Sequence, residues 1–293
     1  MNIRRALKEI FKILNHPSNK NHKYKTFCRI IWWKVNRIFF QLPVVIDIDN
    51  KIKCICYPIS SYGGQVVYYN LPEYPEMCFM KKVLSDKSVF IDVGANMGIF
   101  SLNAASKIKN GKIYAFEPVP KVFDILCQNI RINNLDKTIK ASEKVVSSNN
   151  GSEKFVIEDM LEWSHISSGT SGKSLLIPSV KLDYFCRKNN IKYVDLVKID
   201  VEGAEMKVLR GFESYLKNGR VGVLIIELNA DGRLDGVDAQ KTMDYIRQFN
   251  YTTYTINYDL QLEEITKADN DRTYNIIAIS DKKVGTFRSD IKS

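Results

Sequence analysis

Short apolar runs alternate with amphipathic segments from residue 88 to residue 280 of this 293-residue chain. Alternation at this pace is typical of a parallel sheet with helices on both faces. The last two apolar runs follow each other without a helix between them, which predicts an antiparallel edge hairpin. The fold class is therefore α/β, with a mostly parallel, seven-stranded Rossmann-like sheet. We predict strands at 88–93, 112–117, 139–146, 194–200, 221–228, 251–257 and 273–280, and helices at 98–108, 121–133, 204–217 and 238–249.

The segments around this alternation set the expected domain boundaries. Residues 44–85 are predicted to be a lead-in of short strands, with a turn at Tyr62-Gly63-Gly64 and a further strand after it. Residues 86–283 form the Rossmann-like domain, and 284–293 form a tail. The stretch 147–176 is rich in Ser, Gly and Asn, so we expect a surface excursion there, and a lid is one interpretation of it.

Residues 1–43 are predicted to be a basic, amphipathic helical extension. Residues 1–40 hold ten Lys and Arg against a single acid, Glu9, whereas the rest of the chain is close to neutral. Helices are expected at 3–14 and 24–42. In the first, one apolar stripe contains Ile3, Leu7, Ile10, Phe11 and Leu14, and in the second the side chains expected to face inward are Phe27, Ile30, Ile31, Val35, Ile38, Phe39 and Leu42. Three interpretations stay open: a membrane surface with anionic lipid, a partner such as a glycosyltransferase, or packing on the main domain or a second subunit.

The remaining composition limits the compartment and the partners. The six cysteines show no CxxC pair and there are only three histidines, so we expect free thiols, a cytoplasmic protein, and no metal centre built from His or Cys. No apolar run is long enough to cross a bilayer, so any membrane association is expected to be peripheral. The near-neutral main domain lacks the basic stripe of a nucleic-acid enzyme, and we expect no nucleic-acid partner.

The sequence VFIDVGANMGIFS at 89–101 predicts a ligand loop. A buried strand ends at Asp92, a glycine-containing turn follows, and a helix begins near Gly98. A turn of this kind lets a ligand approach the backbone, and the helix start offers free N–H groups. The spacing of Gly94 and Gly98 differs from the dinucleotide fingerprint, with Asn96 at a position where many such loops have glycine.

A second motif, KIYAFEPVP at 112–120, ends the next strand at Glu117. In a doubly wound fold, an acid at this point accepts hydrogen bonds from ribose hydroxyls. The two motifs together predict a site for a nucleoside cofactor.

A third block, VDLVKIDVEGAEMKVLRG at 194–211, collects ionisable side chains at the end of a central strand. Lys198, Asp200, Glu202 and Glu205 lie where catalytic groups of open α/β sheets gather, and Glu227 ends the neighbouring strand. The alternative is a helix cap, with acids placed by the helix dipole and Lys198 as their partner.

These three blocks, with VLIIEL at 223–228, resemble the FkbM family of methyltransferases over residues 86–230. The resemblance implies a Rossmann-like methyltransferase fold that uses S-adenosylmethionine, usually to O-methylate hydroxyls of sugars, glycans or natural products. Residue by residue, it implies cofactor binding by Asp92, Gly94, Ala95, Asn96, Gly98, Glu117 and Pro118.

Transfer to a hydroxyl requires a base, because the acceptor must lose its proton. We rank Asp200 first, Glu202 second and His165, the one histidine of the main domain, third. Lys198 is expected to hold Asp200, while Glu205 and Glu227 are candidates for binding the acceptor. A divalent metal would suit this many carboxylates, although no spacing requires one. Two rival functions are a non-catalytic nucleoside-binding scaffold and an NAD-dependent oxidoreductase.

Overall fold

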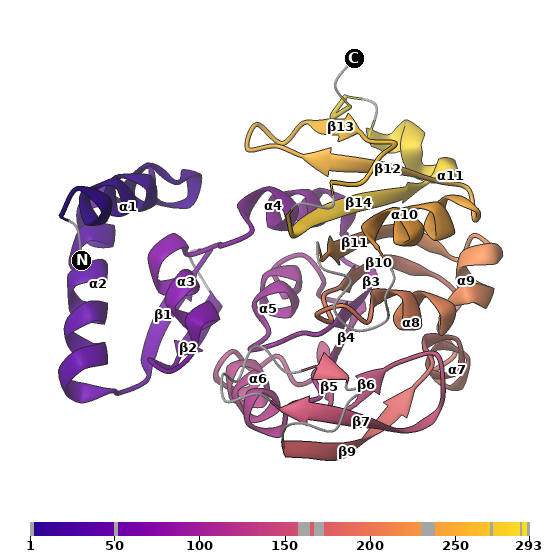
Figure 1. The fold of residues 1–293 in the computed structure, drawn as a ribbon, viewed down its shortest axis with the longest axis horizontal. Helices are drawn as coiled ribbons and strands as arrows, with labels where there is room; N and C mark the ends of the chain where they lie inside the picture. Colours follow the sequence, from indigo (N-terminus) through magenta and orange to yellow (C-terminus); the bar gives the residue numbers. More distant parts are fainter. Residues whose placement is uncertain are drawn as a thin grey trace.

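An eight-stranded sheet with helices on both faces forms the centre of the molecule (Figure 1). The computed structural model describes residues 3–49, 52–157, 165–166, 173–229, 238–269, 272–287 and 289–291. The strand order is β13-β12-β14-β11-β10-β3-β4-β5. The bounds are β3 Val89–Val93, β4 Lys112–Phe116, β5 Ile139–Ser142, β10 Val194–Ile199, β11 Val221–Leu228, β12 Tyr251–Ile256, β13 Leu262–Glu264 and β14 Tyr274–Ser280.

Strands β5, β4, β3, β10 and β11 run parallel to one another, while β14 is antiparallel to both β11 and β12. The antiparallel pairing predicted for the last two strands is therefore confirmed. Strand β14 nevertheless lies inside the sheet, and the short β13 forms the edge beside β12. Ile276, Ile277, Ala278 and Ile279 of β14 are all buried, which is typical of a strand whose two faces are both covered by other elements.

Helices bury apolar side chains on each face of the sheet. Two large clusters of buried residues result, one with α4, α5 and α6, the other with α7, α8, α9 and α10. The helix predicted at 204–217 is two helices, α8 and α9, and Gly211 caps the first of them at a point where a side chain would lie 2.2 Å from the Ser147 carbonyl oxygen. The bounds are α4 Tyr74–Val83, α5 Ile99–Ala105, α6 Pro120–Ile132, α7 Leu182–Lys188, α8 Glu205–Arg210, α9 Glu213–Lys217, α10 Ala239–Arg247 and α11 Asp281–Val284.

The strand predicted at 139–146 is two strands in different sheets. After β5 the chain leaves the main sheet, and β6 (Val145–Val146) pairs with β9 (Lys173–Val180). Strands β7 (Gly151–Ile157) and β8 (His165–Ile166) complete a second, four-stranded sheet. The predicted excursion thus contains ordered strands. The lid interpretation falls largely on 158–164 and 167–172, outside the described residues.

The lead-in segment consists of a hairpin, β1 (Val44–Ile48) and β2 (Ile52–Cys56), followed by α3 (Ser61–Tyr69) and α4. The predicted turn at 62–64 and the strand after it are wrong, because these residues form α3. The Ser60 side chain caps this helix by accepting a hydrogen bond from the Gly63 N–H at 2.7 Å. Gly64 of this helix packs against Trp33, whose ring nitrogen would lie 3.6 Å from a Cβ there, an ordinary contact distance.

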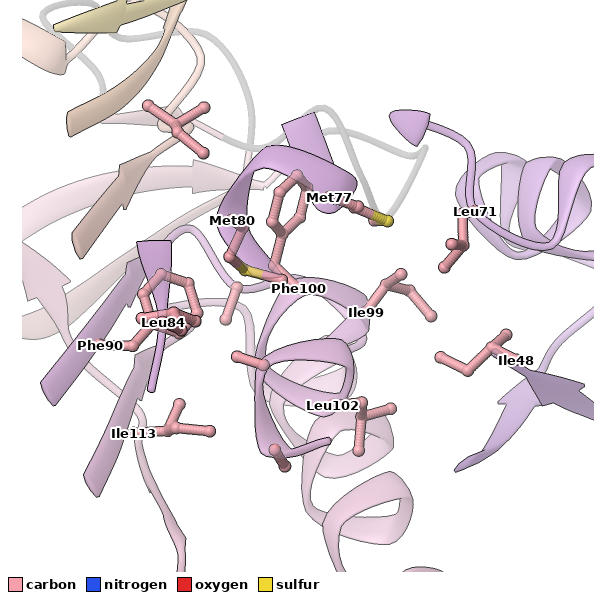
Figure 2. Packing of buried hydrophobic residues seen from close by; sticks show 14 of the residues in the cluster. Ile48, Leu71, Met77, Met80, Leu84, Phe90, Ile99, Phe100, Leu102 and Ile113 are labelled. Atoms are coloured by element: carbon pink, nitrogen blue, oxygen red, sulfur yellow. The ribbon is translucent and has the colours of Figure 1, made fainter. Parts of the chain in front are cut away.

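The lead-in segment shares its core with the main domain. Figure 2 shows Ile48 and Leu71 facing side chains of α4 and α5, among them Met77, Ile99 and Phe100. All five belong to one continuous buried cluster. The segment is thereby fixed against the helix that follows the ligand loop.

The N-terminal helices lie at one end of the molecule (Figure 1). They are α1 (Ile3–Asn15) and α2 (Lys23–Val35), joined by the short η1 (Pro17–Asn19), with a π-helical turn η2 (Asn36–Phe40) after α2. Both predicted helices are confirmed. Of the side chains expected to face inward from the second, Ile30 is buried, whereas the others are exposed: Phe27, Ile31, Val35, Ile38, Phe39 and Leu42. In the described part of the chain, no helix has the length and apolarity needed to cross a bilayer.

Candidate active site

The loop after β3 brings backbone groups into a tight turn at the carboxyl edge of the sheet. Gly94 has a φ of 75°, and a Cβ there would lie 1.7 Å from the Asp200 carbonyl oxygen, so only glycine fits. Asn96 also has a positive φ, of 51°, which asparagine tolerates better than most residues. Its side-chain oxygen accepts a hydrogen bond from the Met97 N–H at 2.7 Å. These backbone conformations and the hydrogen bond define the shape of the loop.

Asp92 lies at the buried end of β3 beneath this loop. The Ser101 hydroxyl donates to its Oδ2 at 2.6 Å. Burial raises the pKa of Asp92 to about 6, although the hydrogen bond from Ser101 and the nearby Lys198 lower it. The side chain thus ties the start of α5 to the strand.

Glu117 follows β4 and connects the ligand loop after β3 to the loop after β4. Its Oε2 accepts from the Asn96 N–H and its Oε1 from the Val119 N–H, both at 2.9 Å. Burial raises the pKa of Glu117 to about 7, while these two N–H groups lower it. A carboxylate has about four lone-pair sites, so two remain for a ligand's hydroxyl groups.

Lys198 is the centre of the charged cluster. Its side chain is 1 % exposed, and its Nζ lies 2.9 Å from Asp200 Oδ2 and 3.6 Å from Glu73 Oε2. The ammonium also lies 4.8 Å from the centre of the Phe100 ring. Burial by itself lowers the pKa of Lys198. The carboxylates of Asp200, Glu73 and Glu227 raise it by more, so the net pKa is above the ordinary value of a lysine. The lysine is therefore a buried permanent cation that neutralises neighbouring acids.

Glu227 of β11 faces the same cluster. Burial, reinforced by the Asp200 carboxylate, raises its pKa to about 10. The nearby Lys198 ammonium lowers this pKa in turn. Asp200 and Glu227 thus place two carboxyl groups near one buried cation.

A cavity of about 350 Å³ joins these groups. One end is lined by Asp92, Gly94, Ala95, Asn96, Glu117 and Pro118, and the other by Glu73, Lys198, Asp200, Glu202 and Glu227. Helix α3 closes the second end with Tyr62 and Gln65, and strand β14 closes it with Asn275 and with Thr273, which directly precedes the strand. The volume is in the range of small-ligand sites, and the two ends suit a cofactor beside an acceptor.

Three carboxylates at the rim are close enough to share a cation. One oxygen from each of Asp200, Glu202 and Glu227 lies within 4.8 Å of the others. Carboxylate oxygens suit Mg²⁺ or Ca²⁺, but Lys198 already supplies a positive charge at Asp200, and a metal would compete with it. The residues therefore do not favour a metal over the lysine.

Comparison with known families identifies the chain. The sequence description "Methyltransferase FkbM domain" matches residues 92–253, more than half of the chain. The match begins at Asp92 and spans the ligand loop, Glu117 and the whole Lys198 block. The chain belongs to the FkbM methyltransferase family.

Two of the curated proteins similar to this FkbM protein carry methyltransferase names and are matched over more than half of the chain. The methyltransferase sdnD of Sordaria araneosa is 27 % identical over 211 residues, which cover 58 % of this chain and 76 % of that protein. The hexuronic acid methyltransferase AglP of Haloferax volcanii is 27 % identical over 191 residues, covering 65 % and 70 %. Among solved structures, a putative rRNA methylase from Clostridium thermocellum aligns with a TM-score of 0.45 and 10 % identity, covering 71 % of this chain and 94 % of that one. The fold assignment rests on the sheet order itself.

Of the predicted site residues of this FkbM protein, two lie beside the cavity rather than among its lining residues. Gly98 has a φ of 92° and packs against Leu126, so it shapes the start of α5. Glu205 accepts a hydrogen bond from the Gly203 N–H at 2.8 Å and thus holds the turn after Asp200. Burial raises the pKa of Glu205 to about 7. His165 belongs to β8, but its side chain lies outside the described residues.

Sequence reasoning missed the residues that close the acceptor end. Glu73 accepts from the Tyr62 hydroxyl and from the Asn275 amide, each at 2.9 Å, in addition to its contact with Lys198. Tyr62 and Glu73 come from the lead-in segment, and Asn275 comes from β14. Three elements far apart in the chain meet here, and no local spacing could have predicted their contact.

Proposed function

We propose that this protein O-methylates a hydroxyl of a sugar, glycan or natural-product-like acceptor, with S-adenosylmethionine as methyl donor. Membership of the FkbM family supports methyl transfer. The name of the relative AglP, a hexuronic acid methyltransferase, supports a sugar-like acceptor. The hydrogen-bonding groups at the second end of the cavity suit an acceptor with several hydroxyls.

The residues at the first end fit the proposed cofactor. Glu117 keeps lone pairs for ribose hydroxyls, and Gly94, whose missing side chain lets the loop pack against the Asp200 backbone, fixes the loop that lines this end. The acidic lining also complements a cationic ligand. When bound, S-adenosylmethionine supplies a methyl group on a sulfonium, which departs as a neutral thioether.

Asp200 is the proposed base. Its Oδ2 is paired with Lys198 at 2.9 Å, which keeps negative charge at the rim of the cavity and orients the second oxygen. The acceptor proton would pass to this carboxylate as the oxygen gains the methyl group. Glu227 would hydrogen-bond another hydroxyl of the acceptor and fix its orientation, and Glu202 remains the second candidate base. Lys198 is a positioning residue in this scheme.

One observation carries the proposal: the Lys198–Asp200 pair and Glu117 line a single cavity at the carboxyl edge of the sheet. The test incubates the full chain with S-[methyl-³H]adenosylmethionine and a panel of neutral hexosides, hexuronides and phenols. We expect label in a hexoside or hexuronide, stable to mild alkali as an ether must be, whereas a methyl ester would be hydrolysed.

Matched variants locate the chemistry. Asp200→Asn should abolish most transfer, whereas Asp244→Asn, an exposed acid on α10, should leave it unchanged. Label that is lost on mild alkaline treatment would contradict O-methylation of a hydroxyl. Transfer that survives in Asp200→Asn would remove Asp200 from the mechanism.

A further inference from the structure

Helix α2 has two apolar faces, and only one of them is covered. Thr26, Ile30 and Trp33 are buried, with Trp33 packed against Gly64 of α3. The opposite face is a row of exposed side chains at intervals of three and four residues: Tyr24, Phe27, Ile31, Trp32 and Val35. The helix is therefore anchored by one face and presents an aromatic stripe on the other.

The stripe continues beyond the helix. Ile38, Phe39, Phe40 and Leu42 are exposed directly after it, and Leu7 and Phe11 are exposed on α1. Of the eighteen exposed large hydrophobic side chains in the described part of the chain, twelve lie between residues 7 and 45. Concentration of this kind marks an interaction surface, since scattered exposed hydrophobics need no explanation but contiguous ones do. We call the exposed side chains of residues 7–42 the arm face.

Positive charge borders the arm face. In helical projection, Lys23 and Lys34 flank the aromatic stripe on one side and Lys25 on the other. Lys8 and Lys12 accompany Leu7 and Phe11 on α1. No acidic residue occurs between Glu9 and Asp47. An apolar stripe that is flanked by lysines matches a surface with negative charge outside and hydrocarbon beneath.

We infer that the arm face docks this protein onto a membrane surface that contains anionic lipid. Two other occupants fit less well. Pairing with a second copy through this face would bring rows of lysine together without acids to balance them. A nucleic acid would satisfy the lysines, but its phosphates would leave Ile31, Val35 and Ile38 exposed to water.

The helix that carries most of the arm face packs against a helix that lines the cavity. Helix α2 packs on α3, and α3 supplies Tyr62 and Gln65 to the acceptor end. Asn19, between α1 and α2, donates to the carbonyl oxygen of Tyr68 at 2.8 Å and so fixes the arm to the same helix. Packed helices lie about 8–10 Å apart, so docking brings the acceptor end within a few helix diameters of the lipid surface.

The experiment is flotation of the full chain with vesicles. One set contains equal parts of phosphatidylglycerol and phosphatidylcholine, and the other contains phosphatidylcholine alone. We expect binding to the anionic vesicles that is at least about tenfold tighter than to the neutral ones at low salt, and that weakens strongly at about 0.5 M salt. Failure to bind the anionic vesicles at low salt, or equal binding to both sets, would overturn the proposal.

Two pairs of variants distinguish vesicle binding through the arm face from nonspecific binding through other exposed residues. Phe39→Ser and Leu176→Ser remove side chains that are 73 % and 75 % exposed, so neither should disturb folding. Only Phe39→Ser should weaken vesicle binding, by about tenfold. Lys34→Gln should weaken it about fivefold, whereas the exposed Lys241→Gln should not.

Equal effects within either pair would refute a role for the arm face. The remaining outcomes point to other occupants and also overturn the proposal. A concentration-dependent dimer that Phe39→Ser dissociates, without vesicle binding, would assign the face to a second copy. Tighter binding to an RNA oligonucleotide than to anionic vesicles would assign it to nucleic acid. None of these readouts depends on methyl transfer, so they stand apart from the proposed function.

Discussion

Replacing Gly94 by alanine tests whether the ligand loop and the Asp200 turn depend on their close approach. The added Cβ would lie 1.7 Å from the Asp200 carbonyl oxygen, whereas real contacts of this kind exceed 3.0 Å. The two segments must therefore separate by more than 1 Å. The positive φ of Gly94 costs about 1–2 kcal/mol for a residue with a side chain, and the forced displacement about 1–3 kcal/mol more. We expect the free energy of unfolding to fall by about 2–5 kcal/mol.

Two further glycines separate these contributions. Gly151 has a φ of 138° and no atom within 4 Å of its added Cβ, so Gly151→Ala should lose only the conformational part, about 1–2 kcal/mol. Gly285 has a φ of −58° and equally open space, so Gly285→Ala should change stability by less than about 1 kcal/mol.

Urea unfolding measures the three stabilities, and calorimetric titration with S-adenosylhomocysteine measures the ligand site. A displacement above 1 Å at a positioned site costs about 100-fold, so Gly94→Ala should weaken binding by about that factor while both controls keep it. If Gly94→Ala loses no more stability than Gly151→Ala and binds as tightly as the unmodified chain, the close approach is not the reason for the glycine.

Three other predictions follow from the charged groups. Asp200→Asn should lower turnover about 10²–10⁴-fold in a methyl-transfer assay while calorimetry finds S-adenosylhomocysteine affinity preserved, and loss of both would assign Asp200 to cofactor binding instead. Glu117 has a pKa of about 7, and ribose hydroxyls need an ionised acceptor, so cofactor affinity should fall up to about tenfold per pH unit below 7 and level off above it. Glu117→Gln should flatten this calorimetric pH profile. An unaltered slope in the variant would point to another group. Lys198→Met leaves the surrounding carboxylates without their cation, so the free energy of unfolding measured in urea should fall by about 3–5 kcal/mol. A fall below about 1 kcal/mol would mean that Lys198 and Asp200 are not tightly coupled.

The cofactor end of the site could be predicted from the sequence because its parts are local. Asp92, Gly94 and Asn96 lie within one strand–turn–helix unit, and Glu117 ends the next strand, which pairs with the first. Parallel neighbours bring their carboxyl ends to the same edge, so adjacency in the sequence became adjacency in space.

The acceptor end could not be predicted because tertiary packing decides it. Val66, Val67 and the tyrosines after them favour a strand by propensity, yet they form α3, which packs against α2. The contact of Glu73 with Lys198 then depends on the placement of that whole segment.

The same limit applies to α2. Two apolar faces are present in its sequence, and periodicity cannot tell which of them is covered. The structure buries the face with Ile30 and Trp33 and exposes the one with Phe27 and Ile31. The predicted inward orientation is therefore confirmed for Ile30 and wrong for Phe27 and Ile31.

The central claim, an adenosyl-cofactor site built on Glu117, is tested most directly by a thermal-shift titration. The ligands are S-adenosylmethionine, S-adenosylhomocysteine and NAD, applied to the unmodified chain, to Glu117→Ala and to the surface control Glu213→Ala. A ligand at 100 times its dissociation constant stabilises the native state by about 2.7 kcal/mol, which gives a clear rise in Tm. The account predicts this rise with both adenosyl ligands, its loss in Glu117→Ala alone, and no rise with NAD. A rise with NAD only, or none with any of the three ligands, would contradict it.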